Sequence, residues 1–81
     1  MGKARIIFRI YPKEGMLDKA LKEIKELKPM DIQEDEVAFG IKLINVLFVY
    51  DADKNGSSEI EEKLKKLDSV SEVEVQDESL M

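Results

Sequence analysis

The sequence predicts an α+β fold whose elements follow the order β-α-β-β-α-β along the chain. Segments with the alternating or β-branched composition of strands occur four times, and apolar residues recur at helical spacing in two others. The length is the third observation, because 81 residues enclose one hydrophobic core and leave too little interior for a second. We therefore expect a single domain that spans residues 1–81.

The first strand and the first helix have the clearest patterns. Apolar side chains occupy every second position from Ala4 to Ile10, as in a strand with one face more deeply buried than the other. Pro29 excludes α-helix beyond Lys28, because the residue before a proline avoids the helical region. Between the first strand and Pro29, the spacing of apolar residues along one helical face predicts the first helix. These residues are Leu17, Ala20, Leu21, Ile24 and Leu27.

The next two segments predict a pair of strands. Residues 30–39 lack clean alternation, and we expect an edge strand there that is bulged within the acidic stretch from Glu34 to Glu36. Residues 41–50 are nearly continuous apolar sequence, rich in β-branched and aromatic side chains, which is typical of a central strand. The residues that follow have the composition of a turn.

A second helix and a last strand complete the chain. Ser58 and Glu61 have the S-x-x-E spacing of a capping box, so we expect a helix from about residue 59 to residue 67. Val73 and Val75 alternate with polar residues and predict the fourth strand. We expect the tail 77–81 to be looser than this strand.

This order of elements is that of the ferredoxin-like split motif, a four-stranded antiparallel sheet with two helices on one face. Right-handed crossovers place the first and third strands in the middle of the sheet. Leu43, Leu47 and Val49 then face the open side, beside Ile7 and Tyr11. Such an apolar stripe is typical of an association surface, and it is also suited to closing a homo-oligomer.

The composition excludes several classes of function. With no cysteine and no histidine, the chain has no disulfide, no thiolate or imidazole nucleophile and no zinc site of the usual type. Its net charge of −5 argues against direct nucleic-acid binding. The apolar run 46–50 is too short to cross a bilayer and the start resembles no secretory leader, so we expect cytoplasmic residence without membrane association.

One acidic turn matches the spacing of a calcium loop. Asp51, Asp53, Asn55 and Glu62 fit the oxygen-ligand positions of D-x-[DN]-x-[DN]-G-x5-E. The preceding segment has the pattern of a strand instead of the incoming helix, and a solvated turn explains the same residues. We therefore expect no metal site and no other cofactor. A calcium-binding module stays an alternative, as does a small-ligand regulatory module of the same fold.

A second acidic run raises the question of acid–base chemistry. Asp31, Glu34, Asp35 and Glu36 are close in sequence, and neighbouring carboxylates can raise one another's pKa. Exposed carboxylates in a row more often stay ionised and hydrated, and no companion base accompanies these. We therefore predict no enzymatic activity for this run.

The sequence resembles the elongation factor 1-beta family over nearly its whole length. The resemblance is carried by Val37-Ala38-Phe39-Gly40-Ile41-Lys42 and the apolar strand after it, the acidic loop 51–56, a glutamate-rich helix and Val73-x-Val75. It implies the ferredoxin-like fold and a translation elongation factor. Such a factor binds elongation factor 1-alpha, the GTPase that delivers aminoacyl-tRNA to the ribosome, and promotes exchange of GDP for GTP. The resemblance thus implies a binding protein and not an enzyme.

The same resemblance implies which residues meet the GTPase. In eukaryotic relatives, an aromatic residue before a glycine and a lysine just before the C-terminal residue are implicated in loosening the nucleotide. Phe39 matches the aromatic residue, whereas Leu80 stands where the lysine would be. The resemblance implies Phe39 as an anchor, Gly40 as its hinge, Leu80 and Met81 as apolar contacts, and Lys42 as a partner for acidic side chains.

Overall fold

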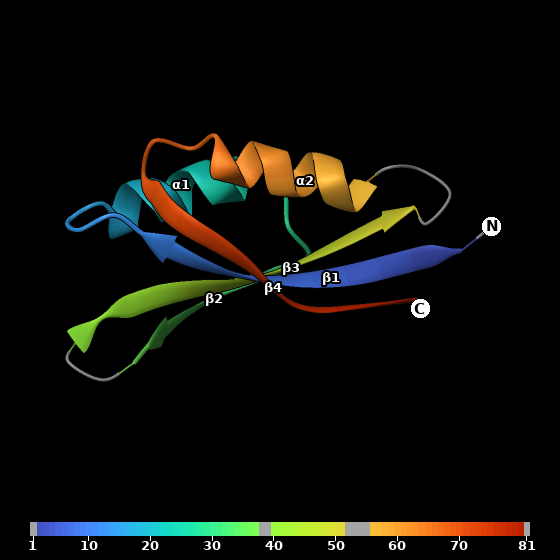
Figure 1. Cartoon of the computed structure of the whole chain (residues 1–81), viewed down its shortest axis with the longest axis horizontal. Coiled ribbons are helices and arrows are strands. Elements are labelled where there is room, and N and C mark those ends of the chain that lie inside the picture. The colour runs from blue at the N-terminus through green and yellow to red at the C-terminus, as the bar shows by residue number, and fades with distance from the viewer. Residues whose placement is uncertain (1, 38–39, 52–55, 81) are drawn as a thin grey trace.

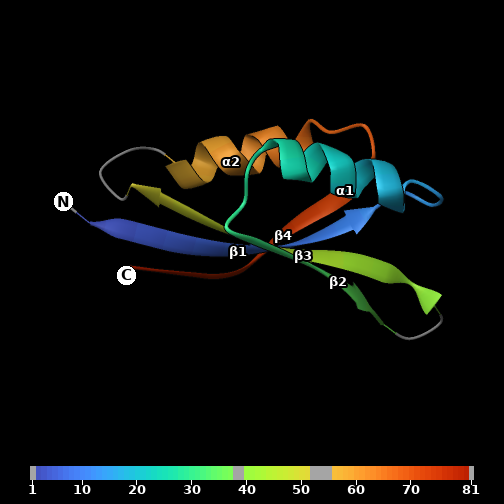
Figure 2. The same ribbon diagram turned by 180° about the vertical axis from the view of Figure 1, so that it is seen from behind.

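The fold was obtained as a computed structural model, which describes residues 2–37, 40–51 and 56–80. In chain order the elements are β1 (Lys3–Pro12), α1 (Leu17–Glu26), β2 (Asp31–Glu36), β3 (Lys42–Asp51), α2 (Gly56–Lys65) and β4 (Val70–Leu80). Within these ranges the strands form one antiparallel sheet in the order β2-β3-β1-β4. Both helices cover the same face of the sheet (Figures 1 and 2). The predicted order, the split motif and the central first and third strands are confirmed.

The hydrophobic core lies between the sheet and the two helices. The rings of Phe8 on β1 and Phe48 on β3 meet edge to face, with centroids 6.1 Å apart and planes at 72°. Ile24 of α1 and Leu64 of α2 are fully buried against this face. The other buried members of the core are Ile6, Ile10, Ala20, Ile44, Val46 and Val70. The core therefore uses the alternate residues that the period of two predicts.

The first helix ends as the sequence predicts, within two residues. Leu27 follows α1 as its C-cap, and Lys28 has a φ of 58°. A residue in this left-handed region commonly follows a helix and turns the chain away before a proline. Neither helix within the described ranges has the length and the apolar character needed to cross a membrane.

The second helix begins earlier than predicted. It runs from Gly56 to Lys65, so Ser58 lies inside the first turn and not at the N-cap, and the predicted capping box is wrong. A Cβ atom at position 56 would lie 2.8 Å from the Cδ2 atom of Tyr50 and 2.9 Å from its Cβ atom. This close approach to the end of β3 accounts for the glycine, because any other side chain would displace the tyrosine.

The structure corrects the prediction for the edge strand β2. This strand pairs with β3 from Asp31 to Glu36 without a shift in register, so the bulge predicted in the acidic stretch is wrong. Exposed charged side chains along an edge strand discourage pairing with another chain. The acidic stretch therefore fits an edge without any bulge.

The irregularities lie in the other edge strand. The register of β4 against β1 shifts between Ile7 and Phe8 and again between Tyr11 and Pro12. At the first shift Phe8 pairs with Val75 and Ile7 with Asp77, which leaves Gln76 as the extra residue. Beyond it the strand continues to the end of β4, so the expectation of a looser tail is wrong as far as residue 80.

Candidate partner-binding surfaces

The connection between β2 and β3 presents apolar side chains at one end of the sheet. The backbone N–H of Val37 donates to the carbonyl of Ile41 at 2.8 Å, so one hydrogen bond joins the first and last of the five residues 37–41 between the two strands. Gly40 has a φ of 71°, and a Cβ atom there would meet no described residue within 4 Å apart from its chain neighbours. The backbone conformation, and not a lack of room, therefore favours glycine. Val37 is 40% and Ile41 52% exposed. Phe39, the predicted anchor, lies outside the described residues.

A depression of about 530 Å³ lies between this connection and the loop that follows β1. It is lined by Pro12, Lys13, Glu14, Gly15, Leu17, Gly40, Ile41 and Lys42. The backbone N–H of Lys13 donates to the carbonyl of Ser69 at 2.8 Å, which ties this loop to the start of β4. Two of the predicted partner-binding residues, Gly40 and Lys42, therefore share the wall of one hollow.

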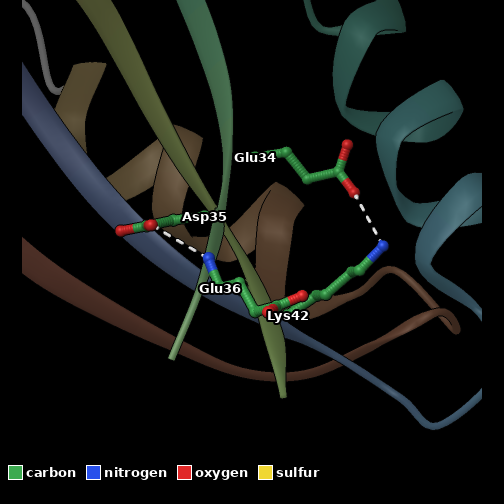
Figure 3. A network of polar contacts seen from close by, with 4 residues as sticks. All are labelled: Glu34, Asp35, Glu36 and Lys42. Carbon is green, nitrogen blue, oxygen red and sulfur yellow. Dashed lines mark hydrogen bonds and ion pairs between the residues drawn. The ribbon is translucent and has the colours of Figure 1, made fainter. Parts of the chain in front are cut away.

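Lys42 stands among carboxylates on the helix side of the sheet edge (Figure 3). Its Nζ atom lies 3.9 Å from Glu34 Oε1, and the two side chains are 50% and 44% exposed. Glu36 is opposite Lys42 in the register, whereas Asp35 points away and accepts the backbone N–H of Glu36 at 2.9 Å. An exposed ion pair of this length contributes little to stability. Strand alternation also separates Asp35 from Glu34, so these carboxylates do not converge.

Leu80 lies at the opposite end of the sheet. It pairs with Ala4 at the start of β1, and Ala4 pairs in turn with Tyr50 near the end of β3. Figure 1 shows both chain termini at the end away from the β2–β3 connection. Leu80 is 77% exposed, and Met81 lies outside the described residues. Among the described residues of the predicted set, Gly40 and Lys42 are therefore not brought together with Leu80: they stand at two ends of a molecule whose longest dimension is 42 Å.

Side-chain hydrogen bonds that sequence reasoning missed hold the C-terminal end of β4. The Tyr50 hydroxyl donates to Glu78 Oε2 at 2.5 Å, and Arg5 Nε donates to Ser79 Oγ at 3.1 Å. The bond to Glu78 raises the pKa of Tyr50 above its ordinary value, because it favours the protonated phenol. The only signal of these bonds in the sequence is a tyrosine near the end of a mostly apolar strand.

The open face of the sheet has apolar side chains and two arginines, Arg5 and Arg9, on its central strands and acids at both edges. Ile7 is opposite Leu47 on the two central strands, as predicted, and both are half-buried. The acidic residues of the edges on this face are Asp31, Asp35, Glu72, Glu74 and Asp77. If two copies met face to face with their strands aligned, these acidic edges would oppose each other. A homo-oligomer through this face stays an untested prediction.

The calcium alternative also stays untested. Asp51 ends β3, and Glu62 is exposed on α2, while Asp53 and Asn55 lie outside the described residues. Within the described ranges no group of three or more acidic side chains is arranged to hold a metal ion.

The chain is similar to known proteins over nearly its whole length. Residues 6–81 match the family described as the EF-1 guanine nucleotide exchange domain. The chain is 32% identical over 89 aligned residues to an elongation factor 1-beta from Aeropyrum pernix, covering 100% of this chain and 99% of that protein. It is 35% identical over 83 residues to an elongation factor 1-beta from Methanosphaera stadtmanae, covering 95% and 94% of the two chains.

Proposed function

The chain belongs to the family of EF-1 guanine nucleotide exchange domains and is a translation elongation factor of the exchange type, and from this premise we propose that its partner is elongation factor 1-alpha. In this proposal the chain binds the GDP form of that GTPase, speeds the loss of GDP and is released when GTP binds. It acts by binding alone and converts no substrate of its own.

The physical basis of such exchange is differential affinity. A protein that binds the nucleotide-free GTPase more tightly than the GDP form weakens GDP binding by the same factor, because the coupling between two ligands is reciprocal. The exchange factor must therefore contact parts of the GTPase that move when the nucleotide leaves. Contacts to the phosphates and to the magnesium ion hold a nucleotide in its GTPase, and weakening them is the most direct way to release it.

The observation that carries the proposal is a match to the family over nearly the whole chain, on a sheet with an exposed apolar group at each end. The connection between β2 and β3 offers Ile41, and the other end offers Leu80. A paired, rigid sheet keeps the distance between two such ends constant. We infer that the two ends contact two separate regions of the GTPase at once.

Each of the residues that the resemblance selects has a proposed role at the interface. Phe39 is the proposed anchor, and Gly40 permits the backbone turn that presents it, as its positive φ supports. Lys42 pairs with an acidic side chain of the partner, since its bond to Glu34 is long and exposed. Leu80 and Met81 make apolar contacts at the other end.

The substitution Phe39→Ala tests the proposal. We expect the catalytic efficiency of stimulated GDP release from elongation factor 1-alpha to fall roughly ten-fold or more, as for a central aromatic anchor of an interface. Release is followed with a fluorescent GDP analogue and excess unlabelled nucleotide. The matched control is Met30→Ala, because Met30 is an apolar side chain with 66% exposure away from both ends. Equal release with wild type and Phe39→Ala would contradict the anchor role, and no acceleration by wild type would contradict the function.

A further inference from the structure

The direction of the last residues of β4 depends on the bulge at Gln76. Before the bulge, Val75 pairs with Phe8 on the helix side, and after it Glu78 pairs with Ile6 on the same side. Without the extra residue, strand alternation would turn Glu78 to the open face. The bulge therefore determines that Glu78 and Leu80 share the face on which Tyr50 lies.

Tyr50 reaches Glu78 across an intervening strand. Tyr50 belongs to β3 and Glu78 to β4, with β1 between them, so their backbones are two strand spacings or about 10 Å apart. The β1 residue opposite Tyr50 is Ala4, which is 2% exposed. Because alanine is small, the phenol ring has room to pass over β1 at this position and to place its hydroxyl 2.5 Å from Glu78 Oε2.

The start of α2 holds the tyrosine in this position. Gly56 lies so close to the Tyr50 ring that a Cβ atom there would be 2.8 Å from Cδ2. The bond to Glu78 keeps the tyrosine pKa above its ordinary value, although Ser57 at the start of α2 acts to lower it. The hydroxyl therefore remains a proton donor at neutral pH. One side chain thus links β3, α2 and the end of β4 across β1.

We propose that Tyr50 is a positioning residue that, through Glu78, fixes the direction of the last residues of β4 and so presents Leu80 to the GTPase. This inference rests on the proposed function. Leu80 is 77% exposed at the end of an edge strand, so its own burial does little to hold it. Terminal residues fray unless other contacts tie them down. A preordered end improves binding, because less conformational entropy is lost when the complex forms.

The test compares two tyrosines that each donate to a glutamate. Tyr50→Phe removes only the hydroxyl and keeps the ring against Gly56 and Ala4. Tyr11→Phe is the matched control, since its hydroxyl donates to Glu74 Oε2 at 3.4 Å at the other end of the sheet. Two quantities are measured: amide hydrogen exchange of residues 77–80, and the maximal rate and half-saturating concentration of stimulated GDP release from elongation factor 1-alpha.

We expect Tyr50→Phe to speed amide exchange at residues 77–80 and to lower the efficiency of GDP release by roughly three- to ten-fold, the range of one hydrogen bond. The loss of efficiency should appear mainly as a higher half-saturating concentration, because the variant must order the end of β4 when it binds. Tyr11→Phe should leave amide exchange at residues 77–80 within about two-fold of wild type, since it is far from this end. Glu78→Ala should behave like Tyr50→Phe, whereas Glu78→Gln keeps an acceptor oxygen and should retain most activity.

Two results would overturn the inference. Unchanged amide exchange at residues 77–80 in Tyr50→Phe would show that the tyrosine does not fix the strand. Faster amide exchange with unchanged GDP release would show that the direction of this end does not matter to the partner. If wild type itself fails to accelerate release, the proposed function and the role of Leu80 are both lost. The amide data would then still decide whether Tyr50 holds the end of β4.

Discussion

The two ends of the sheet are built by different kinds of interaction. At the β2–β3 end, one backbone hydrogen bond between Val37 and Ile41 closes a five-residue connection, and Gly40 supplies the positive φ. At the other end, β4 is held to residues far away in sequence by the Tyr50–Glu78 and Arg5–Ser79 bonds. The first end depends on local backbone conformation, whereas the second depends on long-range side-chain contacts. Substitutions at the two ends should therefore fail in different ways.

The largest expected effect is at the C-terminal end. Ala4→Leu fills the space over which the Tyr50 ring passes, so we expect the free energy of unfolding to fall by about 2 kcal/mol, as in an overpacked site. Urea denaturation measures this loss, and amide exchange at residues 77–80 should rise at the same time. Lys3→Leu is the control, because Lys3 is exposed and the same side chain is added one position away. Equal stability of the two variants would show that nothing crosses β1 at Ala4.

A smaller effect is expected at the β2–β3 end. Gly40→Ala forces an alanine into the left-handed region and should lower the free energy of unfolding by about 1 kcal/mol. Among the described residues, apart from the chain neighbours, no atom lies within 4 Å of the added Cβ, so the expected cost is backbone strain. Gly2→Ala is the control, because Gly2 has equally open surroundings without a positive φ. Amide exchange at residues 77–80 should stay as in wild type. If it rises, the two ends are coupled and the comparison fails.

The same distinction explains what the sequence could and could not predict. Alternation from Ala4 to Ile10 and the helical spacing that includes Ile24 placed the core correctly, because periodicity is a local signal. The continuation of β4 was missed because the extra residue at Gln76 interrupts its alternation. The start of α2 was misplaced because the contact between Gly56 and the Tyr50 ring is tertiary.

The residues of the candidate site also differ in whether the sequence alone could identify them. The resemblance to the elongation factor 1-beta family selected Phe39, Gly40 and Lys42, and the structure places Gly40 and Lys42 beside one hollow. It also selected Leu80, but its place in a strand at the far end of the sheet was missed because the tail 77–81 was expected to be looser. Tyr50 was not selected, since its bond to Glu78 joins residues 28 positions apart and follows no short motif. A functional residue that acts through distant contacts needs the fold before it can be recognised.

The smallest expected effect is a pH dependence confined to the C-terminal end. The pKa of Tyr50 is raised above the ordinary 10.0, chiefly by its hydrogen bond to Glu78. A group with a raised pKa in the folded state stabilises the fold fully below its unfolded pKa, and this contribution is lost as the pH rises through the folded value. We therefore expect the free energy of unfolding to fall above about pH 10 through loss of this bond. The exposure of the pair keeps this change small.

Lysines titrate in the same range, so the measurement is a difference between variants. Urea denaturation from pH 8 to pH 11 should show a shallower loss of stability in Tyr50→Phe than in wild type. Tyr11→Phe should follow wild type, because the pKa of Tyr50 is intact in that variant. Parallel profiles for all three proteins would mean that ionisation of Tyr50 is not linked to folding. The long-range bond would then contribute nothing to stability, and only the local backbone conformation at Gly40 would distinguish the two ends.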